Sequence, residues 1–198
     1  MMDIVLATRN RNKVEEMRKI LSSGEDRFSI STLDDFPACN DVEEDGETFE
    51  ENAVKKAEYV FKYTGKTSIA DDSGLEVEAL NGAPGIFSAR YAGEFANDET
   101  NTRKLLEEMK SVPYKERRAR FVCCIAVASA EGLKTFSGHV NGRIGTEKRG
   151  FKGFGYDPIF YPDGYEMTFA EMSDEEKNSI SHRAMALGKL QKYLLGNT

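Results

Sequence analysis

The stretch SIADDSGLEVEALNGAPGIFSARYAG, residues 68–93, decides how the chain folds, because two aspartates separate two apolar runs in it. The runs predict two strands, at residues 67–70 and 75–80. Asp71 and Asp72 then come at the end of the first strand, where adjacent side chains point in different directions. Gly74 is expected to let the chain turn sharply away.

Paired carboxylates at a strand end suit the binding of a divalent metal and the activation of water. The alternative is an Asx turn that leads into a hairpin. Asp-Asp-Ser-Gly is a common tetrapeptide, and taken alone it favours the turn.

Apolar periodicity outside this stretch predicts intermixed strands and helices. Val14, Met17 and Leu21 recur at helical spacing after an apolar first strand. Further strands are expected at residues 4–7, 120–128 and 133–140, and helices at residues 49–63, 101–109 and 174 to the end, with a break near Ser181. A Ser-Ala-Glu-Gly turn joins the strands at 120–140 into a hairpin. These elements predict an α/β fold with a mixed β-sheet.

Composition limits the classes of function. The 198 residues carry 27 basic and 34 acidic side chains, a formal charge of −7, which is the opposite of what nucleic-acid or anionic-membrane binders usually carry. The sequence contains no apolar run of membrane-spanning length and no secretory signal, so we expect a cytoplasmic protein. Three cysteines without metal-ligand spacing indicate buried thiols in a reducing compartment. Without repeats or a linker, residues 1–198 are expected to form one domain of two lobes.

The expected helix at 49–63 carries a lysine on its apolar face. Thr48 and Glu51 have the spacing of a capping box at its start, and Lys56 falls in the middle of the apolar side, next to Asn52. Buried lysines are rarely unpaired, so Lys56 is expected to meet a carboxylate or a negative ligand. Alternatively, its stem reaches water.

Acidic residues crowd the segment before this helix. DVEEDGETFEE, residues 41–51, holds seven of them. Such runs are usually solvated surface, but one of these carboxylates could reach the same cleft as the lysine and hold a metal ion. Spacing alone does not select which one.

The loop after the first strand is rich in cations and amides. ATRNRNKVEEM, residues 7–17, leads into a helix N-terminus, where free N–H groups and the helix dipole favour an anion. It matches neither a P-loop nor a dinucleotide fingerprint. Taken alone, the segment favours an ordinary helix cap with solvated cations.

Two later segments suit a flat base and its phosphates. GFKGFGYDPIFYPDG, residues 150–164, alternates glycines with aromatic residues that could stack on a base, although such loops also form hairpin corners. SDEEKNSISHR, residues 173–183, opens with a Ser173/Glu176 capping box and ends in a cluster of Lys177, His182 and Arg183. These side chains supply donors for a phosphate or a ring carbonyl oxygen.

The six segments T-x-N-x-x-K, TFEENAVKKA, ADDSGLEV, GAPGIFSARYAG, GFGYDPIF and EEKNSISHR occur in order and together resemble the inosine/xanthosine triphosphate pyrophosphatase family. These enzymes hydrolyse non-standard purine nucleoside triphosphates, such as ITP, dITP and XTP, to the monophosphate and pyrophosphate. The resemblance runs from residue 4 to about 190. It implies an elongated mixed-sheet α/β fold of two lobes with the site in the cleft between them, a Mg²⁺ requirement and a homodimer.

The resemblance also implies roles for individual residues. Asp72 would activate water and, with Glu44, hold magnesium, while Lys56 would act on the phosphates. The groups implied to bind the substrate are Thr8, Arg9, Asn10, Arg11, Asn12 and Lys13 for the triphosphate, Ser73 beside the aspartates, Phe154, Gly155, Tyr156 and Asp157 for base and sugar, and Lys177, His182 and Arg183 for the purine.

One position departs from the pattern, since members often have glycine where this chain has Arg9. Close approach of the backbone to phosphate is therefore in doubt there unless the arginine points outward. Two other functions stay open at this point. One is a nucleotide-binding regulatory module without turnover, and the other is a phosphohydrolase that releases orthophosphate.

Overall fold

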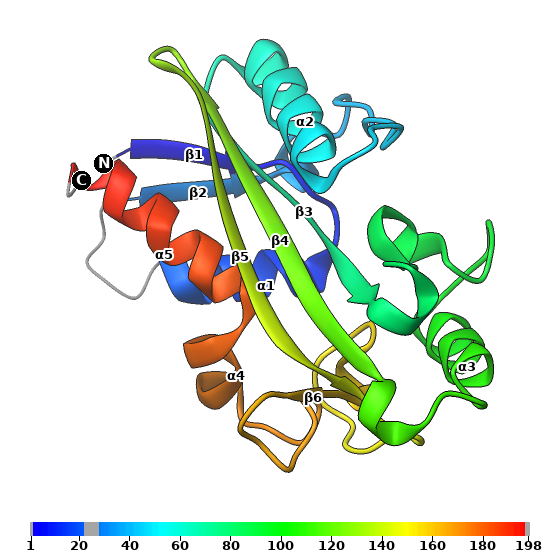
Figure 1. The fold of residues 1–198 in the computed structure, drawn as a ribbon. Coiled ribbons are helices and arrows are strands. Elements are labelled where there is room, and N and C mark those ends of the chain that lie inside the picture. Colours follow the sequence, from blue (N-terminus) through cyan, green and yellow to red (C-terminus); the bar gives the residue numbers. More distant parts are fainter. Residues whose placement is uncertain (1, 22–27, 197–198) are drawn as a thin grey trace. The chain divides into compact units, whose positions relative to one another are not determined.

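The computed structural model describes residues 2–21 and 28–196 and contains a six-stranded sheet with flanking helices (Figure 1). The strands are β1 (Met2–Leu6), β2 (Phe28–Thr32), β3 (Thr67–Val77), β4 (Arg118–Ser129), β5 (Gly132–Ile144) and β6 (Phe160–Pro162). The helices are α1 (Arg11–Leu21), α2 (Phe49–Thr64), α3 (Asp98–Glu108), α4 (Asp174–Ile180) and α5 (His182–Leu194). The strand order is β2-β1-β3-β4-β5-β6. Because β1 runs parallel to β2 and β3 whereas β5 and β6 are antiparallel, the sheet is mixed, as predicted.

Most expected elements are present. The hairpin of β4 and β5 forms, and the C-terminal helix is divided at Ser181 into α4 and α5. The last two residues of that expected helix, 197–198, lie outside the described part of the chain. The short strands β2 and β6 were not predicted: β2 alternates apolar and polar residues over only five positions, and β6 has three residues, too few to show any period.

The prediction of two strands around Asp71 and Asp72 is wrong. A single strand, β3, runs through Thr67–Val77, and residues 78–80 form a 3₁₀ turn instead. Gly74 is buried within this strand and does not end it. β3 lies between β1 and β4 in the sheet and stays extended through both aspartates, so its place in the sheet overrides the turn preference of Asp-Asp-Ser-Gly.

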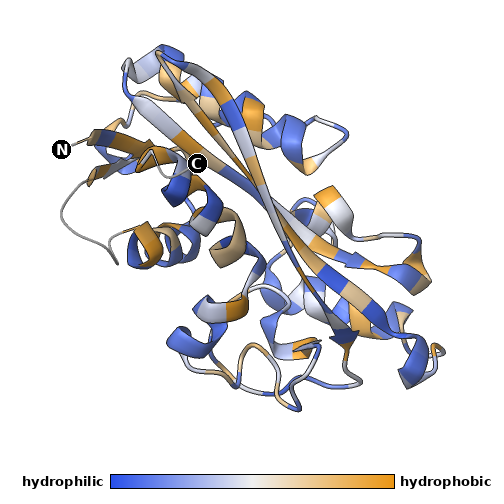
Figure 2. Ribbon diagram, turned by 60° about the vertical axis from the view of Figure 1, so that its left-hand side comes forward, coloured by the Kyte–Doolittle hydropathy of each residue, from blue (hydrophilic) through white to orange (hydrophobic). Residues whose placement is uncertain are grey.

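The chain forms two compact units, and β3, β4 and β5 contribute residues to both. The first unit contains residues 1–72, 123–138 and 183–198, and the second contains residues 73–122 and 139–182. In β4, residues 118–121 alternate between exposed and buried, whereas the apolar residues 123–128 are buried throughout, as in a strand covered on both faces; β5 has more hydrophilic and exposed positions (Figure 2). Within the described residues, none of the helices has the length and apolar character needed to cross a membrane.

In the first unit, helices cover both faces of the sheet. Met17 and Leu21 of α1 and Leu187 and Leu190 of α5 share a core with Ile69 and other strand residues. Helix α2 brings Lys56 and Asn52 to Asp72 from the other face. Asp71 therefore faces α1 and α5, and Asp72 faces α2.

In the second unit, a core of aromatic and aliphatic side chains joins α3 to the sheet. It contains Phe121 of β4, Phe160 of β6 and Phe169, with ring centroids 4.7 to 6.0 Å apart. Arg117 is 4% exposed beside this core and donates to the carbonyl oxygens of Met109, Val112 and Gly145. These bonds fix the end of α3 and the loop after β5, which leads toward the aromatic segment.

Candidate active site

Asp71 lies in a fully buried network of charges in the first unit. Its Oδ2 accepts bonds from Nε and Nη2 of Arg183, both at 3.0 Å, and its Oδ1 lies 2.8 Å from Nζ of Lys13. Burial opposes the charge of the carboxylate, but Lys13, Arg183 and Lys56 hold the pKa of Asp71 well below its ordinary value. Asp71 is thus a permanent anion that joins α1 to α5.

Asp72, on the opposite face, belongs to a second group of charges. Its Oδ1 accepts a bond of 3.1 Å from Nζ of Lys56 and its Oδ2 one of 3.2 Å from Nδ2 of Asn52. The same ammonium donates to Oε1 of Glu44 at 2.5 Å and to the carbonyl oxygen of Asp71 at 2.8 Å. The prediction that Lys56 is buried and meets a carboxylate is confirmed, with 9% of the residue exposed.

The two partners in this group respond differently to their surroundings. Burial disfavours the charge of Lys56, yet Asp72, Glu44 and Asp71 together raise its pKa. Burial also raises the pKa of Asp72, and Glu44 and Asp71 add to this effect while Lys56 opposes it. Asp72 shares a single ammonium with Glu44, so it is less fully neutralised than Asp71, which contacts two cations, Lys13 and Arg183. A carboxylate with a raised pKa is the better proton acceptor of the two.

The residues around Lys56 also fit a magnesium ion. Glu44 and Asp72 point their oxygens at one cationic atom, as they would at a metal. Among the described residues no group of three or more His, Cys, Asp or Glu is placed to hold a metal. Mg²⁺, however, is usually held by one or two carboxylates together with substrate phosphates and water, and this pair supplies that number.

Residues 7–13, which we call the phosphate loop after their predicted role, lead into the N-terminus of α1 as predicted. The side chain of Asn10 accepts a bond from the backbone N–H of Lys13 at 3.2 Å, and the hydroxyl of Thr8 accepts one from the N–H of Asn10. Lys13 points to Asp71, whereas Arg11 and Asn12 are exposed. The implied binding of a triphosphate by this loop stays a prediction.

Arg183 has partners that the sequence did not reveal. Its side chain is 2% exposed, and besides Asp71 it binds Oε2 of Glu16 through Nη1. Both carboxylates raise the pKa of this buried guanidinium. The implied contact of Arg183 with a purine stays a prediction, and such a contact has to compete with two carboxylates of the first unit. Glu16 lies 167 positions away in sequence, so no local pattern could have paired it with Arg183.

The aromatic segment in the second unit forms a tightly constrained loop. Oδ2 of Asp157 accepts bonds from the N–H of Phe154 at 2.9 Å and from Nζ of Lys177 at 2.6 Å. The Lys177 ammonium lies 5.1 Å from the centroid of the Phe154 ring. At Gly153, φ is +70° and a Cβ would lie 2.1 Å from Asp157 Oδ2, so only glycine fits.

Helix α3 supports this loop through residues that were not predicted. The carboxylate of Asp98 accepts the N–H of Gly155 at 2.7 Å, and the hydroxyl of Thr102, one turn later, donates to the carbonyl oxygen of Gly155 at 3.3 Å. The Tyr156 hydroxyl donates to the carbonyl oxygen of Ser88 at 2.8 Å. The N–H and the C=O of Gly155 are thereby both hydrogen-bonded, which fixes the backbone next to Phe154.

The remaining predicted residues of the second unit are Ser73, which is half-buried in β3, and His182, which is 5% exposed. The His182 ring stacks on Phe121 with centroids 4.8 Å apart and planes 9° apart. The structure therefore gives His182 a packing role, and its predicted contact with a purine stays untested. Ser181 ends α4 and separates the helix of Lys177 from that of Arg183.

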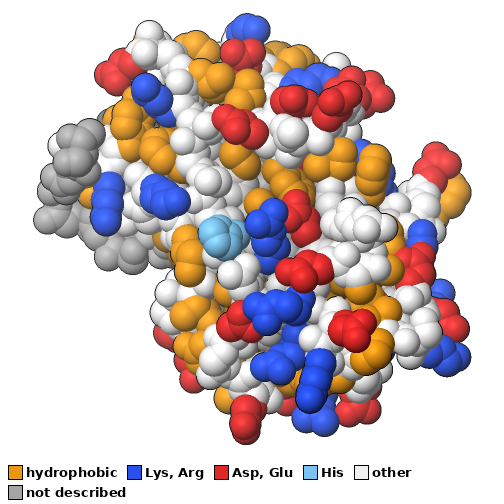
Figure 3. Space-filling model, in the orientation of Figure 1, with side chains coloured by type: hydrophobic (Ala, Val, Ile, Leu, Met, Phe, Trp, Pro, Cys, Tyr) orange, Lys and Arg blue, Asp and Glu red, His pale blue; other side chains and the backbone are white. Residues whose placement is uncertain are grey.

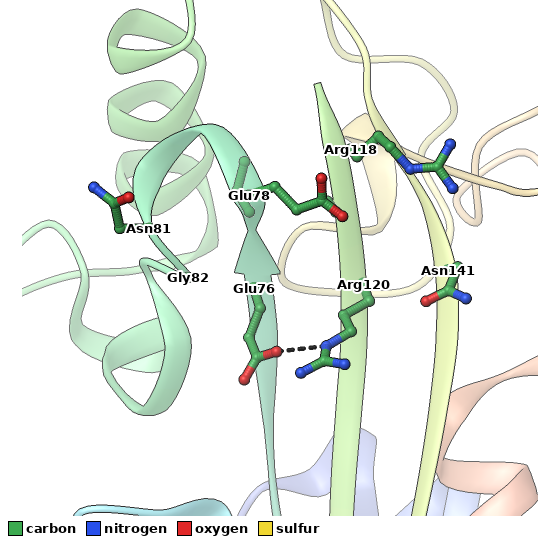
Figure 4. Close-up of a pocket in the computed structure, with 9 residues that line it drawn as sticks. Glu76, Glu78, Asn81, Gly82, Arg118, Arg120 and Asn141 are labelled. Carbon is green, nitrogen blue, oxygen red and sulfur yellow. Dashed lines mark hydrogen bonds and ion pairs between the residues drawn. The ribbon is translucent and has the colours of Figure 1, made fainter. Parts of the chain in front are cut away.

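A hollow of about 430 Å³ in the second unit lies apart from these groups. Figure 4 shows Glu76 of β3 and Glu78 just after this strand opposite Arg120 of β4, while the side chain of Arg118 extends away from them. Glu76 pairs with Nε of Arg120 at 2.6 Å. Because opposite charges face each other across the strands, the hollow has no clear preference for an anion or a cation, and none of the predicted site residues lines it.

Comparison with known proteins agrees with the sequence motifs. The model of the Ham1 family matches residues 4–193. A dITP/XTP pyrophosphatase of Geobacter sulfurreducens is 50% identical over 96% of each chain, and one of Halalkalibacterium halodurans is 49% identical over 98% of this chain and 100% of its own. Among solved structures, the Ham1 proteins of Staphylococcus aureus and Coxiella burnetii superpose with TM-scores of 0.87 and 0.89 at 45% and 42% identity, each over 99% of this chain and 100% of its own. This chain belongs to the Ham1 family.

Proposed function

We propose that this protein hydrolyses non-standard purine nucleoside triphosphates, namely dITP, ITP and XTP, to the monophosphate and pyrophosphate with Mg²⁺. The names of relatives about 50% identical over nearly the whole chain support the reaction and the substrate class. The observation that carries the chemistry is the convergence of Glu44 and Asp72 on the single buried ammonium of Lys56.

The proposed roles on the phosphate side belong to Asp72, Lys13 and Lys56. Asp72 accepts the proton of a water molecule whose oxygen attacks the α-phosphorus, and the bond from that phosphorus to the bridging oxygen breaks as pyrophosphate leaves. Lys13, Lys56 and the N–H groups at the start of α1 stabilise the negative charge that develops. Magnesium, held by Glu44 and Asp72, would neutralise phosphate charge when bound.

The proposed roles on the base side belong to Phe154 and Lys177. The ring of Phe154 offers a stacking surface, and Lys177, fixed by Asp157, is a donor beside it. A 6-oxo purine presents an acceptor where adenine presents an amino donor, so a donor placed at that edge disfavours ATP. Guanine keeps the 6-oxo group and has to be excluded at its 2-amino group by the wall of the pocket.

Product analysis with purified protein, Mg²⁺ and dITP tests the proposal and its alternatives. We expect dIMP and pyrophosphate, no turnover with EDTA, and slower hydrolysis of dATP and dGTP. Release of orthophosphate and dIDP would indicate another phosphohydrolase. Binding of dITP without any product would indicate a regulatory module. Asp72→Asn is the control for a contaminating hydrolase.

Two further points belong to the same proposal, of which the first rests on the resemblance. We propose a homodimer and a cytoplasmic location. Acidic and basic side chains are interspersed on the face drawn in Figure 3, and the net charge is −7. Both observations favour a small anionic substrate, bound by a few local cations, rather than a nucleic-acid partner. Light scattering coupled to size-exclusion chromatography tests the dimer.

A further inference from the structure

Arg9 belongs to the phosphate loop, but its side chain extends away from that loop to the segment that follows β2. Nη1 donates to the carbonyl oxygen of Leu33 at 3.1 Å, Nη2 to that of Cys39 at 2.7 Å, and Nε to Oδ1 of Asp41 at 3.0 Å. Nη1 also lies 3.6 Å from the carboxylate of Asp34. All three guanidinium nitrogens are thus bound to residues 33–41, a geometry that the flat, forked side chain of arginine suits and lysine does not.

The segment held in this way delivers Glu44. Residues 33–35 form a 3₁₀ turn, and the chain then runs without regular structure to the start of α2 at Phe49. Arg9 holds the first part of the segment. The second part is held where Glu44 meets Lys56 and where the N–H of Gly46 donates to Oδ1 of Asn52 at 2.8 Å. Only two residues, Val42 and Glu43, lie between Asp41 and Glu44, and three steps along the chain span at most about 10 Å, so the position of Asp41 restricts where the Glu44 carboxylate can lie.

An arginine at this position causes no backbone strain. Among the described residues that are not glycine, Asn81 alone has a positive φ. Arg9 therefore adopts a conformation open to any residue, and the absence of glycine does not distort the loop. The side chain adds contacts that glycine could not make. It also resolves the doubt raised by the sequence, because the guanidinium points away from the loop N–H groups.

We propose that Arg9 is a positioning residue that couples the phosphate loop to the acidic segment and thereby places the Glu44 carboxylate for magnesium. The inference rests on the proposed function for its link to the metal, but the anchoring of residues 33–45 can be tested without it. A phosphate role for the Arg9 side chain is disfavoured by the same geometry, since the three nitrogens are engaged elsewhere in the first unit.

The test compares Arg9→Gly and Arg9→Lys with wild type and with Lys62→Gln. Lys62 is an exposed cation of α2 that pairs with Glu58, one turn away, at 3.7 Å, so its variant controls for the loss of one charge. At saturating dITP we expect Arg9→Gly to raise the half-activating Mg²⁺ concentration about tenfold, a change of about 1.4 kcal/mol. The kcat at saturating Mg²⁺ should stay within about threefold of wild type. Arg9→Lys should lie between the two, because an ammonium cannot reproduce the fork.

A second readout requires neither metal nor nucleotide. Amide hydrogen exchange of the free protein should be faster in peptides from residues 33–45 of Arg9→Gly, while peptides from α2 and β3 stay protected and Lys62→Gln matches wild type. Arg9→Lys keeps this test valid if the glycine variant does not fold.

Three results overturn the inference. Unchanged exchange in residues 33–45 would show that Arg9 does not hold the segment. An unchanged Mg²⁺ requirement together with a raised KM for dITP would show that Arg9 acts on the substrate. An equal rise of the Mg²⁺ requirement in Lys62→Gln would make the effect one of net charge. If wild type does not hydrolyse dITP at all, the proposed function fails, and the exchange experiment alone decides whether Arg9 anchors the segment.

Discussion

Replacing Asp71 by asparagine should destabilise the protein more than it impairs catalysis. The carboxylate is fully buried and binds two nitrogens of Arg183 and the ammonium of Lys13. Asparagine keeps the shape but removes the charge, and its NH₂ group must face a donor on one side. The change therefore leaves two cations in a buried place with their common anion gone.

The size of the effect follows from the partners that remain. Removing one member of a buried ion pair costs about 3–5 kcal/mol. Arg183 keeps Glu16, so we expect the lower end, about 3 kcal/mol. For a chain of 198 residues, each kcal/mol lowers Tm by about 2–4 °C, and Asp71→Asn should melt about 6–12 °C below wild type.

Asp72→Asn is the matched comparison, because it makes the same chemical change at the next residue. Lys56 keeps Glu44 and the carbonyl oxygen of Asp71, so the loss of stability should be no more than about 1.5 kcal/mol. The kcat should fall by about 10² or more, as for a general base. Calorimetry without Mg²⁺ and steady-state hydrolysis of dITP measure both variants.

We expect Asp71→Asn to lower mainly the Tm and Asp72→Asn to lower mainly the kcat. If Asp71→Asn melts within about 2 °C of wild type, the buried network does not stabilise the fold as argued. If Asp72→Asn keeps a near-normal kcat and an unchanged Mg²⁺ dependence, Asp72 is neither the base nor a magnesium ligand.

Three further predictions concern single side chains. Lys56→Met should lower the free energy of unfolding by about 1–3 kcal/mol without Mg²⁺, because it leaves the buried Asp72 beside a second carboxylate without their shared ammonium. The same change should lower kcat/KM about 10²-fold. Urea melts that match wild type would show that the ammonium is not needed for folding. Gly153→Ala should raise the KM for dITP and destabilise the protein, because the added Cβ meets the Asp157 carboxylate. Gly155 also has a positive φ, but a Cβ there would lie in open space, so Gly155→Ala should show only a backbone cost of about 1–2 kcal/mol. Equal effects of the two variants on KM and stability would argue against the fixed loop. Burial raises the pKa of Cys124 to about 11, so at pH 8 only about 10⁻³ of this thiol is ionised. Alkylation of Cys124 by iodoacetamide should therefore be negligible until urea unfolds the chain or the pH rises toward 11. Rapid labelling of Cys124 in the native protein would contradict its burial.

The elements that sequence predicted well are those whose signal is local. The apolar spacing of α2 and the hairpin turn of β4 and β5 lie within a few residues of the elements they define. The Ser173/Glu176 capping box forms completely at the start of α4. At α2 only half of the predicted box forms, because the side chain of Thr48 caps Glu51 while the Glu51 carboxylate accepts the N–H of Glu47.

The features that sequence could not predict depend on distant partners. Glu16 binds Arg183 across most of the chain, and Asp98 and Thr102 of α3 support the loop around Gly155 through bonds that span more than fifty residues. The turn favoured by Asp-Asp-Ser-Gly does not form, because these residues lie inside a strand of the sheet, and no local pattern reports that pairing.

The continuity of β3 explains why two adjacent aspartates can serve different purposes. At a strand end both would be near water, and their pKa values would differ little. Inside the strand, side-chain alternation places Asp71 among the cations of α1 and α5, where it stays ionised, and Asp72 against α2, where burial and a second carboxylate raise its pKa. Environments that separate the pKa values of two carboxylates allow one to be structural and the other to accept a proton. A shift of β3 by one residue would exchange them, so the strand register and the two helix-covered faces together determine which aspartate is available for chemistry.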